Sequence, residues 1–298
     1  MDDEDFFEFR KRPRRLPALR ALALAAAVGH ASAGAALAYF AARARWVAPL
    51  CASRVACDPL FAPACVPALL RARAGDFEPL PLLAVAALVG AALTGAPALS
   101  DRLWAANATS VERGVAPLRW LDWALSAPAA VAALTVLCGE SDAWAVTRAA
   151  ALAWCAVALA ALHELGLNTQ LALSTLVTCV PGAPPPTWRP LERTRVLAVG
   201  LVPFLASWGA LLDGVSRSRA LLPGWLTAVV AALCALCCAA ATNALAATVA
   251  RLRAPATNAA AHETVALLID VAARATLAVA VGVGFEGGAP TFVPRAPC

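Results

Sequence analysis

The sequence predicts an all-α fold, namely a bundle of seven transmembrane helices. Of the 298 residues, 61% are hydrophobic and only 14% are charged, and the mean hydropathy is +0.71. Soluble globular proteins contain about 45–50% apolar and about 25% charged residues. The apolar runs are long and do not alternate, which favours helices over a closed barrel. This composition excludes a disordered tail protein, a disulfide miniprotein and a soluble α/β enzyme.

Seven apolar runs are long enough to cross a bilayer, for which a helix needs about 20 residues. They cover residues 18–42, 80–99, 116–138, 143–165, 196–213, 223–249 and 264–285. An eighth run, 171–180, is too short to span and leads into a proline-rich stretch, so we expect a loop or re-entrant piece there. The sequence therefore predicts an N-terminal tail (1–15), a membrane domain (16–285) with long loops at 43–79 and 166–195, and a short C-terminal tail (286–298).

The basic residues predict that the N-terminus lies inside. Of the 24 Lys and Arg residues, fourteen fall in the tail, loops and helix ends on the N-terminal side of the membrane, and eight fall on the opposite side. The other two, Arg148 and Arg274, fall within predicted spans. Since basic residues concentrate in short cytoplasmic loops, the loop 166–195 is expected inside and the loop 43–79 outside.

Cysteines occur both in the predicted outside loop and inside a predicted helix. Cys51, Cys57 and Cys65 share the outside loop, where an oxidising exterior permits a disulfide, but spacing does not determine which cysteines pair. The run from Cys234 to Cys238 lies within the sixth span. It is typical of small apolar residues in an alanine-rich helix, although a soft-metal site has the same residue types.

Five ionisable residues fall inside the predicted spans and more than four positions from either end, where each costs about 2.5–3.5 kcal/mol to insert and is therefore a candidate for function. They are His30, Asp122, Arg148, Asp270 and Arg274. Asp270 and Arg274 are four residues apart and so share one helix face. Arg274 lies near the middle of its span and needs an anion, for which Asp270 and Asp122 are the natural partners. A buried charged cluster of this kind either binds a ligand or an ion, or it is a structural ion pair that holds the third and seventh spans together.

The third span carries a motif that points to a family. Residues 116–127, APLRWLDWALSA, resemble the heliorhodopsin pattern. In that pattern Asn-Pro and Arg-Trp are followed by a carboxylate, an aromatic residue and then Ser-x-Ser or Ser-Ala. Glu164 and His30 also match positions of that family, and the resemblance extends over about 16–285. It implies a rhodopsin-like bundle with the N-terminus inside and retinal as cofactor. It further implies that Asp122 stands at the counterion position, with Ser126 and His30 close to the retinal site.

The seventh span departs from this family at one decisive position. Heliorhodopsins bind retinal as a Schiff base on a lysine in that span, whereas residues 272–277 here read AARATL and place Arg274 at the lysine position. A Schiff base requires an amine that can lose its proton, but arginine remains protonated. The only lysine of the chain is Lys11, in the tail. The histidine of the family's second span is also missing, and Asp122 replaces the usual glutamate.

The sequence therefore predicts a heliorhodopsin-like integral, multi-pass membrane protein that cannot hold retinal covalently. We expect a non-photochemical role in signalling, scaffolding or apolar-ligand binding, and no enzymatic activity, because no complete catalytic set of residues is present. The alternative is a channel or carrier for anions or small solutes that uses Asp122, Arg148, Asp270 and Arg274. The expected partners are the lipid bilayer, a second copy of the chain and a cytosolic protein, and not nucleic acid.

Overall fold

The computed structural model describes residues 16–44, 48–57, 67–178, 190–220, 222–253 and 259–286. These residues form eight helices and one two-stranded sheet. The helices are α2 (Pro17–Ala44), α3 (Pro79–Leu99), α4 (Asp101–Glu112), α5 (Pro117–Leu137), α6 (Ala143–Thr178), α7 (Pro190–Ser218), α8 (Gly224–Arg253) and α9 (Ala259–Glu286), and the strands are β1 (Ala48–Cys57) and β2 (Pro67–Phe77).

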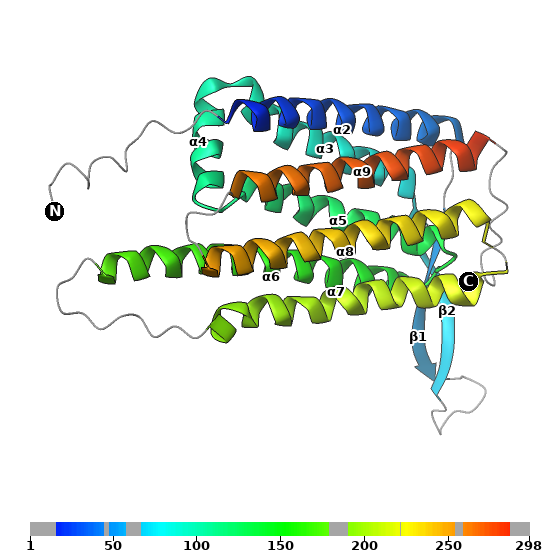
Figure 1. Cartoon of the computed structure of the whole chain (residues 1–298). Helices are drawn as coiled ribbons and strands as arrows, with labels where there is room; N and C mark the ends of the chain where they lie inside the picture. The colour runs from blue at the N-terminus through cyan, green and yellow to red at the C-terminus, as the bar shows by residue number, and fades with distance from the viewer. Residues whose placement is uncertain are drawn as a thin grey trace, which may run out of the picture.

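Seven of the described helices, all except α4, are long and apolar enough to cross a membrane. They lie side by side along the bundle (Figure 1). Large apolar side chains such as Val28, Trp144 and Val202 are exposed on its outer surface, where lipid would cover them. The predicted seven-helix bundle is thus confirmed, and the chain is an integral, multi-pass membrane protein. The inside position of the N-terminus stays a prediction.

Prolines stand at the first position of α3 and α5, and prolines also lie inside three of the spans. Helices α3 and α5 start at Pro79 and Pro117, because the fixed φ of proline suits the first helical turn, where its missing N–H costs nothing. Pro97, Pro128 and Pro203 lie inside α3, α5 and α7. Neighbouring helices and local adjustments allow such prolines within membrane helices.

Helix α4 was not predicted from the sequence because it is too short and too polar to span. It begins at the N-cap Ser100, whose hydroxyl accepts a hydrogen bond from the Leu103 amide at 3.4 Å. Its buried face, which includes Trp104 and Ala108, packs against Leu19 of α2. Figure 1 shows α4 crossing the bundle at the end where α2 begins. The helix therefore covers that end of the bundle.

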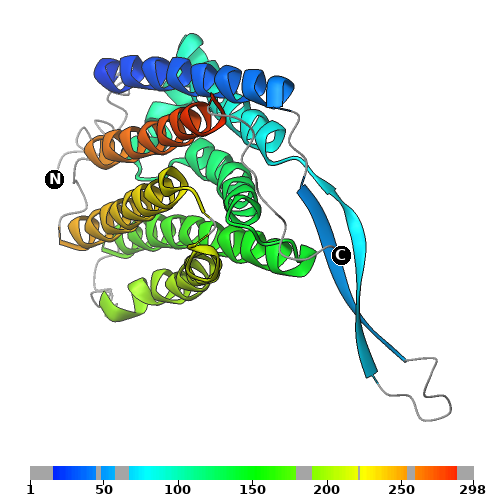
Figure 2. The same ribbon diagram turned by 90° about the vertical axis from the view of Figure 1, so that its right-hand side faces the viewer.

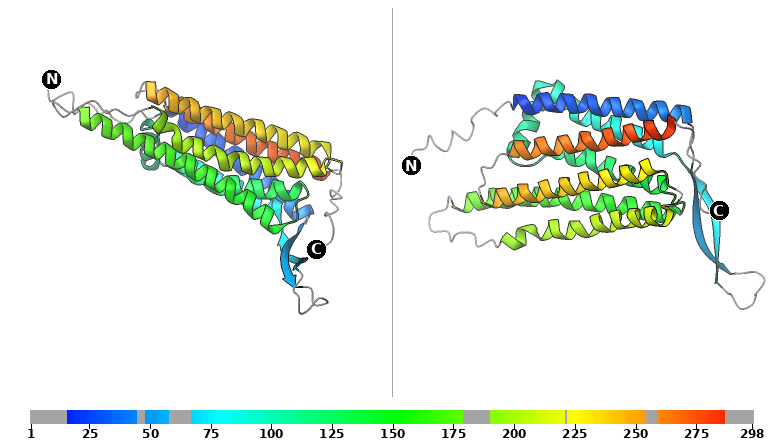
Figure 3. Two further views of the ribbon diagram at one scale, coloured as in Figure 1. Left: turned by 90° about the horizontal axis from the view of Figure 1, so that it is seen from below. Right: turned by 45° about the vertical axis from the view of Figure 1, so that its right-hand side comes forward.

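The expected loop at 43–79 instead contains an antiparallel hairpin of β1 and β2, with a bulge between Leu50 and Cys51. The hairpin projects from the end of the bundle opposite α4 (Figures 2 and 3). Its base is attached by a hydrogen bond from the Cys51 amide to the Ser141 carbonyl, at 2.7 Å. Cys51 is also disulfide-bonded. The side chains of Cys57 and Cys65 lie outside the described residues, so the pairing stays open.

The prediction of a loop or re-entrant piece at 171–180 was wrong for residues 171–178, because α6 continues to Thr178. The run contains no proline or glycine until Pro181, so nothing in its sequence interrupts the helix. Of the predicted loop 166–195, residues 166–178 and 190–195 are therefore helical. The tail 1–15 and residues 287–298 lie outside the described residues.

The helices pack in an order that positions the candidate site. Helix α2 packs against α3 and α9, α3 against α5, α5 against α6, and α6 against α7, whereas α8 packs mainly against α9 and has few contacts with α7. Toward the hairpin end, large aliphatic side chains fill the interior, among them Leu37, Leu80, Leu137, Leu211 and Val281. The middle of the bundle is less densely filled and holds charged residues.

Candidate functional site

Arg274 of α9 is the centre of a buried charged cluster. Its guanidinium Nε donates to Asp270 Oδ1 on the same helix face at 3.3 Å, and its Nη2 lies 2.5 Å from Asp122 Oδ2 of α5. Arg274 and Asp122 are only 6% and 3% exposed. Nη2 also lies 3.5 Å from Ser126 Oγ, one helical turn after Asp122. The predicted site consists of Arg274, Asp122, Asp270, Ser126 and His30, and the structure brings the first four of them together here.

The remaining donors of Arg274 reach the backbone of α3. Nη1 donates to the carbonyl oxygens of Ala86 at 3.2 Å and Ala87 at 3.4 Å. The guanidinium fits here because position 90 is glycine: a Cβ at Gly90 would lie 2.5 Å from Arg274 Cζ, and closer still to Nη1. A guanidinium has five N–H donors. All five therefore face an acceptor on α3, α5 or α9.

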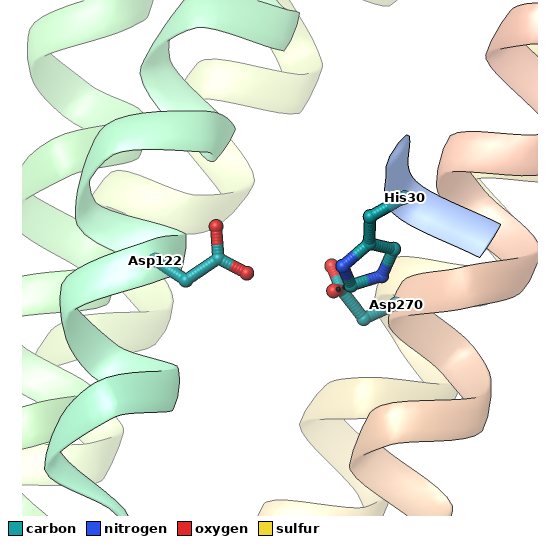
Figure 4. Close-up of side chains that lie close together, drawn as sticks. All are labelled: His30, Asp122 and Asp270. Carbon is teal, nitrogen blue, oxygen red and sulfur yellow. Dashed lines mark ion pairs between the residues drawn. The ribbon is translucent and has the colours of Figure 1, made fainter. Parts of the chain in front are cut away.

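His30 of α2, the fifth predicted site residue, completes the cluster. Its side chain is fully buried, and its Nε2 lies 3.0 Å from Asp270 Oδ2. Figure 4 shows the imidazole of His30 beside the Asp270 carboxylate, with the Asp122 carboxylate directed toward them from α5. Two carboxylates therefore face one guanidinium, and the imidazole lies beside one of them.

The same three residues, His30, Asp122 and Asp270, offer ligand atoms that lie within 4.8 Å of one another. Imidazole and carboxylate groups at such spacing are typical ligands of divalent metals. However, the guanidinium of Arg274 already contacts both carboxylates. A metal ion would have to displace this permanent cation or share its ligands against strong repulsion. The arrangement is therefore that of a salt-bridge network.

A cavity of about 410 Å³ lies beside this cluster and is lined by residues of all seven spans, mainly those of α5, α6, α7, α8 and α9. Its walls are almost entirely apolar and include the rings of Trp120, Trp123, Phe204 and Trp208, as well as many alanines. Ser126, Asp270 and Arg274 line it where it meets the cluster. Small-molecule sites have this character, with apolar walls, a few polar groups and volumes of about 300–1,000 Å³.

The cavity extends to the surface of the bundle that lipid would cover. Leu201 of α7 and Leu245 of α8 both line the cavity and are 42% and 49% exposed. They lie on the two helices that have few contacts with each other. The cavity therefore borders the outer surface of the bundle between α7 and α8.

Arg148, one of the four charged residues of the predicted ion path, does not join the cluster. Its side chain is exposed, and it does not line the cavity beside Arg274. The structure therefore does not connect Arg148 with Asp122, Asp270 and Arg274 along a common polar path.

A second buried ionic cluster lies toward the end of the bundle covered by α4. Arg119 of α5 forms ion pairs with Glu164 of α6, at 2.6 Å, and with Glu263 of α9. Its guanidinium also lies over the ring of Trp120, 4.8 Å from the centroid. Glu164 Oε1 accepts a hydrogen bond from the amide of Ala116, the N-cap of α5, at 2.8 Å. This cluster ties three spans together.

Two smaller polar cavities border the Arg119 cluster. One, of about 50 Å³, is lined by His163 and Arg251 as well as by Arg119 and both glutamates. The other, of about 40 Å³, is lined by Asp122, Asp270, Arg119 and Glu263 and so lies between the two clusters. Each has room for water molecules. Sequence reasoning did not select Glu263, although a carboxylate in the first turns of an apolar helix is a detectable signal.

Gly90→Ala tests how tightly Arg274 is seated. We expect this change to lower the free energy of unfolding by about 1–3 kcal/mol, because the added Cβ pushes the guanidinium away from the Ala86 and Ala87 carbonyls. In an Arg274→Ala background the same change should instead be neutral or stabilising by up to about 1 kcal/mol, since alanine favours a helix more than glycine does. Denaturant unfolding in detergent measures all four proteins of this double-mutant cycle.

The control for this cycle is Gly209→Ala in α7, where an added Cβ would meet open space. This change should have the same small effect in both backgrounds. An equal cost of Gly90→Ala with and without Arg274 would contradict the described seating of the guanidinium.

No protein-family model matches the chain, and no curated protein matches it.

Proposed function

We propose that the chain is a heliorhodopsin-like membrane protein whose central cavity binds an apolar ligand without a covalent bond. The observation that carries this proposal is the cavity of about 410 Å³, which is apolar along its walls and ends at the Arg274 cluster. The family resemblance rests on the motif around Asp122 and Ser126. The proposed role is therefore neither enzymatic nor photochemical. The bound ligand either stabilises the protein or acts as the signal to which it responds.

The absence of a covalent link follows from the chemistry of Arg274. In a pigment of this architecture, a protonated Schiff base on the last span would face the carboxylate of α5. Here a guanidinium faces Asp122 at 2.5 Å instead, which supports the view that the charge pair persists without the chromophore. Arginine keeps its proton and is not a nucleophile toward an aldehyde.

Titration of the wild-type protein with all-trans retinal in lipid nanodiscs tests ligand binding. Three tryptophans line the cavity, so a bound polyene should quench their fluorescence with a saturable, one-site curve. Ala156→Phe in α6 places a large side chain at the cavity wall and should weaken binding about tenfold or more, which corresponds to about 1.4 kcal/mol.

The matched control is Ala151→Phe, on the same helix at an exposed position that does not line the cavity. This variant should bind retinal as the wild type does. Linear, non-saturable quenching in the wild type, or equal binding by Ala156→Phe and the wild type, would overturn the proposal.

A further inference from the structure

The polar groups that line the cavity differ in whether they are free to bind a ligand. Ser207 Oγ donates to the Ala149 carbonyl at 3.1 Å, and Thr242 Oγ1 donates to the Cys238 carbonyl at 2.8 Å. The hydroxyl hydrogen of Ser126, in contrast, has no acceptor among the described residues, although its oxygen lies 3.5 Å from Arg274 Nη2. Ser126 therefore offers a hydrogen-bond donor at the point where the cavity meets the charged cluster.

Arg274 is not free to bind an anionic head group. Each of its five N–H groups already faces an acceptor: Asp270 for Nε, the carbonyls of Ala86 and Ala87 for Nη1, and Asp122 and Ser126 for Nη2. A ligand carboxylate would have to displace one of these buried partners. Any buried group left unpaired in this way costs binding free energy.

The charge of the cluster also opposes an anion. The two carboxylates of Asp122 and Asp270 outnumber the single guanidinium of Arg274 that they contact. Asp270 lines the cavity itself, and its side chain is 13% exposed, so a head group at this end of the cavity lies close to a negative charge. A second carboxylate at this place would be repelled, whereas a hydrogen-bond donor would be attracted.

From these two constraints we infer that the cavity selects a neutral, hydroxyl-bearing ligand, an isoprenoid or long-chain alcohol, over the corresponding carboxylic acid. The ligand hydroxyl donates to the Asp270 carboxylate and accepts from the Ser126 hydroxyl, while the hydrocarbon lies along the apolar walls. An aldehyde only accepts, so it makes one of these two contacts. This inference rests on the proposed function, because it assigns a ligand class to the same cavity.

Three probes with one hydrocarbon and different head groups test the selection: all-trans retinol, retinal and retinoic acid, at a pH where the acid is ionised. Quenching of tryptophan fluorescence in nanodiscs gives each affinity. We expect wild-type protein to bind retinol about tenfold or more tightly than retinoic acid, with retinal between them. Ser126→Ala should weaken retinol binding several-fold, and Asp270→Asn should strengthen retinoic acid binding, so both variants reduce the ratio.

Thr276→Val is the matched control, because the Thr276 hydroxyl bonds the Ala272 carbonyl on α9 and does not line the cavity. It should leave the retinol-to-acid ratio unchanged. Saturable binding of all three probes with the acid equal to or tighter than retinol, or an unchanged ratio in Ser126→Ala, would overturn the inference and leave the proposed function standing. Saturable binding of none of the three would overturn both.

Discussion

Arg274→Ala is expected to lower the free energy of unfolding by about 3–5 kcal/mol, the cost typical of removing one partner from a buried ion pair. The loss is large because the change leaves Asp122 and Asp270 close together in an apolar interior with no guanidinium between them. Desolvated carboxylates of like charge cannot both remain ionised there. Denaturant or thermal unfolding of the protein in detergent, followed by circular dichroism, measures the loss.

The control for this change is Arg148→Ala, which removes an exposed arginine from α6 and should alter stability by no more than about 0.5 kcal/mol. Combining Arg274→Met with Asp122→Asn and Asp270→Asn should recover much of the lost stability, since no unpaired charge is then buried. If Arg274→Ala unfolded like the wild type, the buried network would not be a determinant of this fold.

Arg119→Met should be the other strongly destabilising change, by about 3–5 kcal/mol. It keeps an unbranched aliphatic side chain but removes the guanidinium that pairs with Glu164 and Glu263, both largely buried, and that lies over Trp120. Because Glu164 also accepts the amide hydrogen bond of Ala116, the first turn of α5 should open more readily. Unfolding in detergent gives the size of the effect, and amide hydrogen exchange at the start of α5 gives its location.

Asp101→Asn provides the comparison for an ion pair in water. Asp101 pairs with Arg20 at 2.6 Å, but its side chain is 93% exposed, so its loss should cost no more than about 1 kcal/mol. Equal effects of Arg119→Met and Asp101→Asn would contradict the buried role of the Arg119 cluster.

The spans and the core of the site were predictable because the bilayer imposes strong constraints. A run of about 20 apolar residues has few alternatives to a helix, and a charge in such a run needs a partner. This reasoning identified Asp122 and Asp270 as the natural partners of Arg274, and the structure confirms both contacts. The contact between Asp270 and Arg274 follows from helix geometry, because residues four positions apart lie on the same face of a helix.

The features outside these constraints were not predicted. The strands β1 and β2 lie in a stretch with several prolines and arginines and no clear alternation, so pairing between the two strands, and not their pattern, determines the hairpin. The contact of Arg274 with α3 depends on Gly90, which lies 184 positions away in the chain. The cavity likewise arises from small alanine side chains on five helices, and its size depends on how those helices pack.

The most direct test of whether Arg274 occupies the place of a retinal-bearing lysine is intact mass after incubation with all-trans retinal and reduction with borohydride. Reduction converts a Schiff base into a stable amine, so any covalent link is retained. The wild-type chain should keep its mass, whereas Arg274→Lys should gain one retinyl group on the new lysine, together with a visible absorption band before reduction. A retinyl adduct on the wild-type membrane domain, or no adduct on the Arg274→Lys protein, would contradict this account.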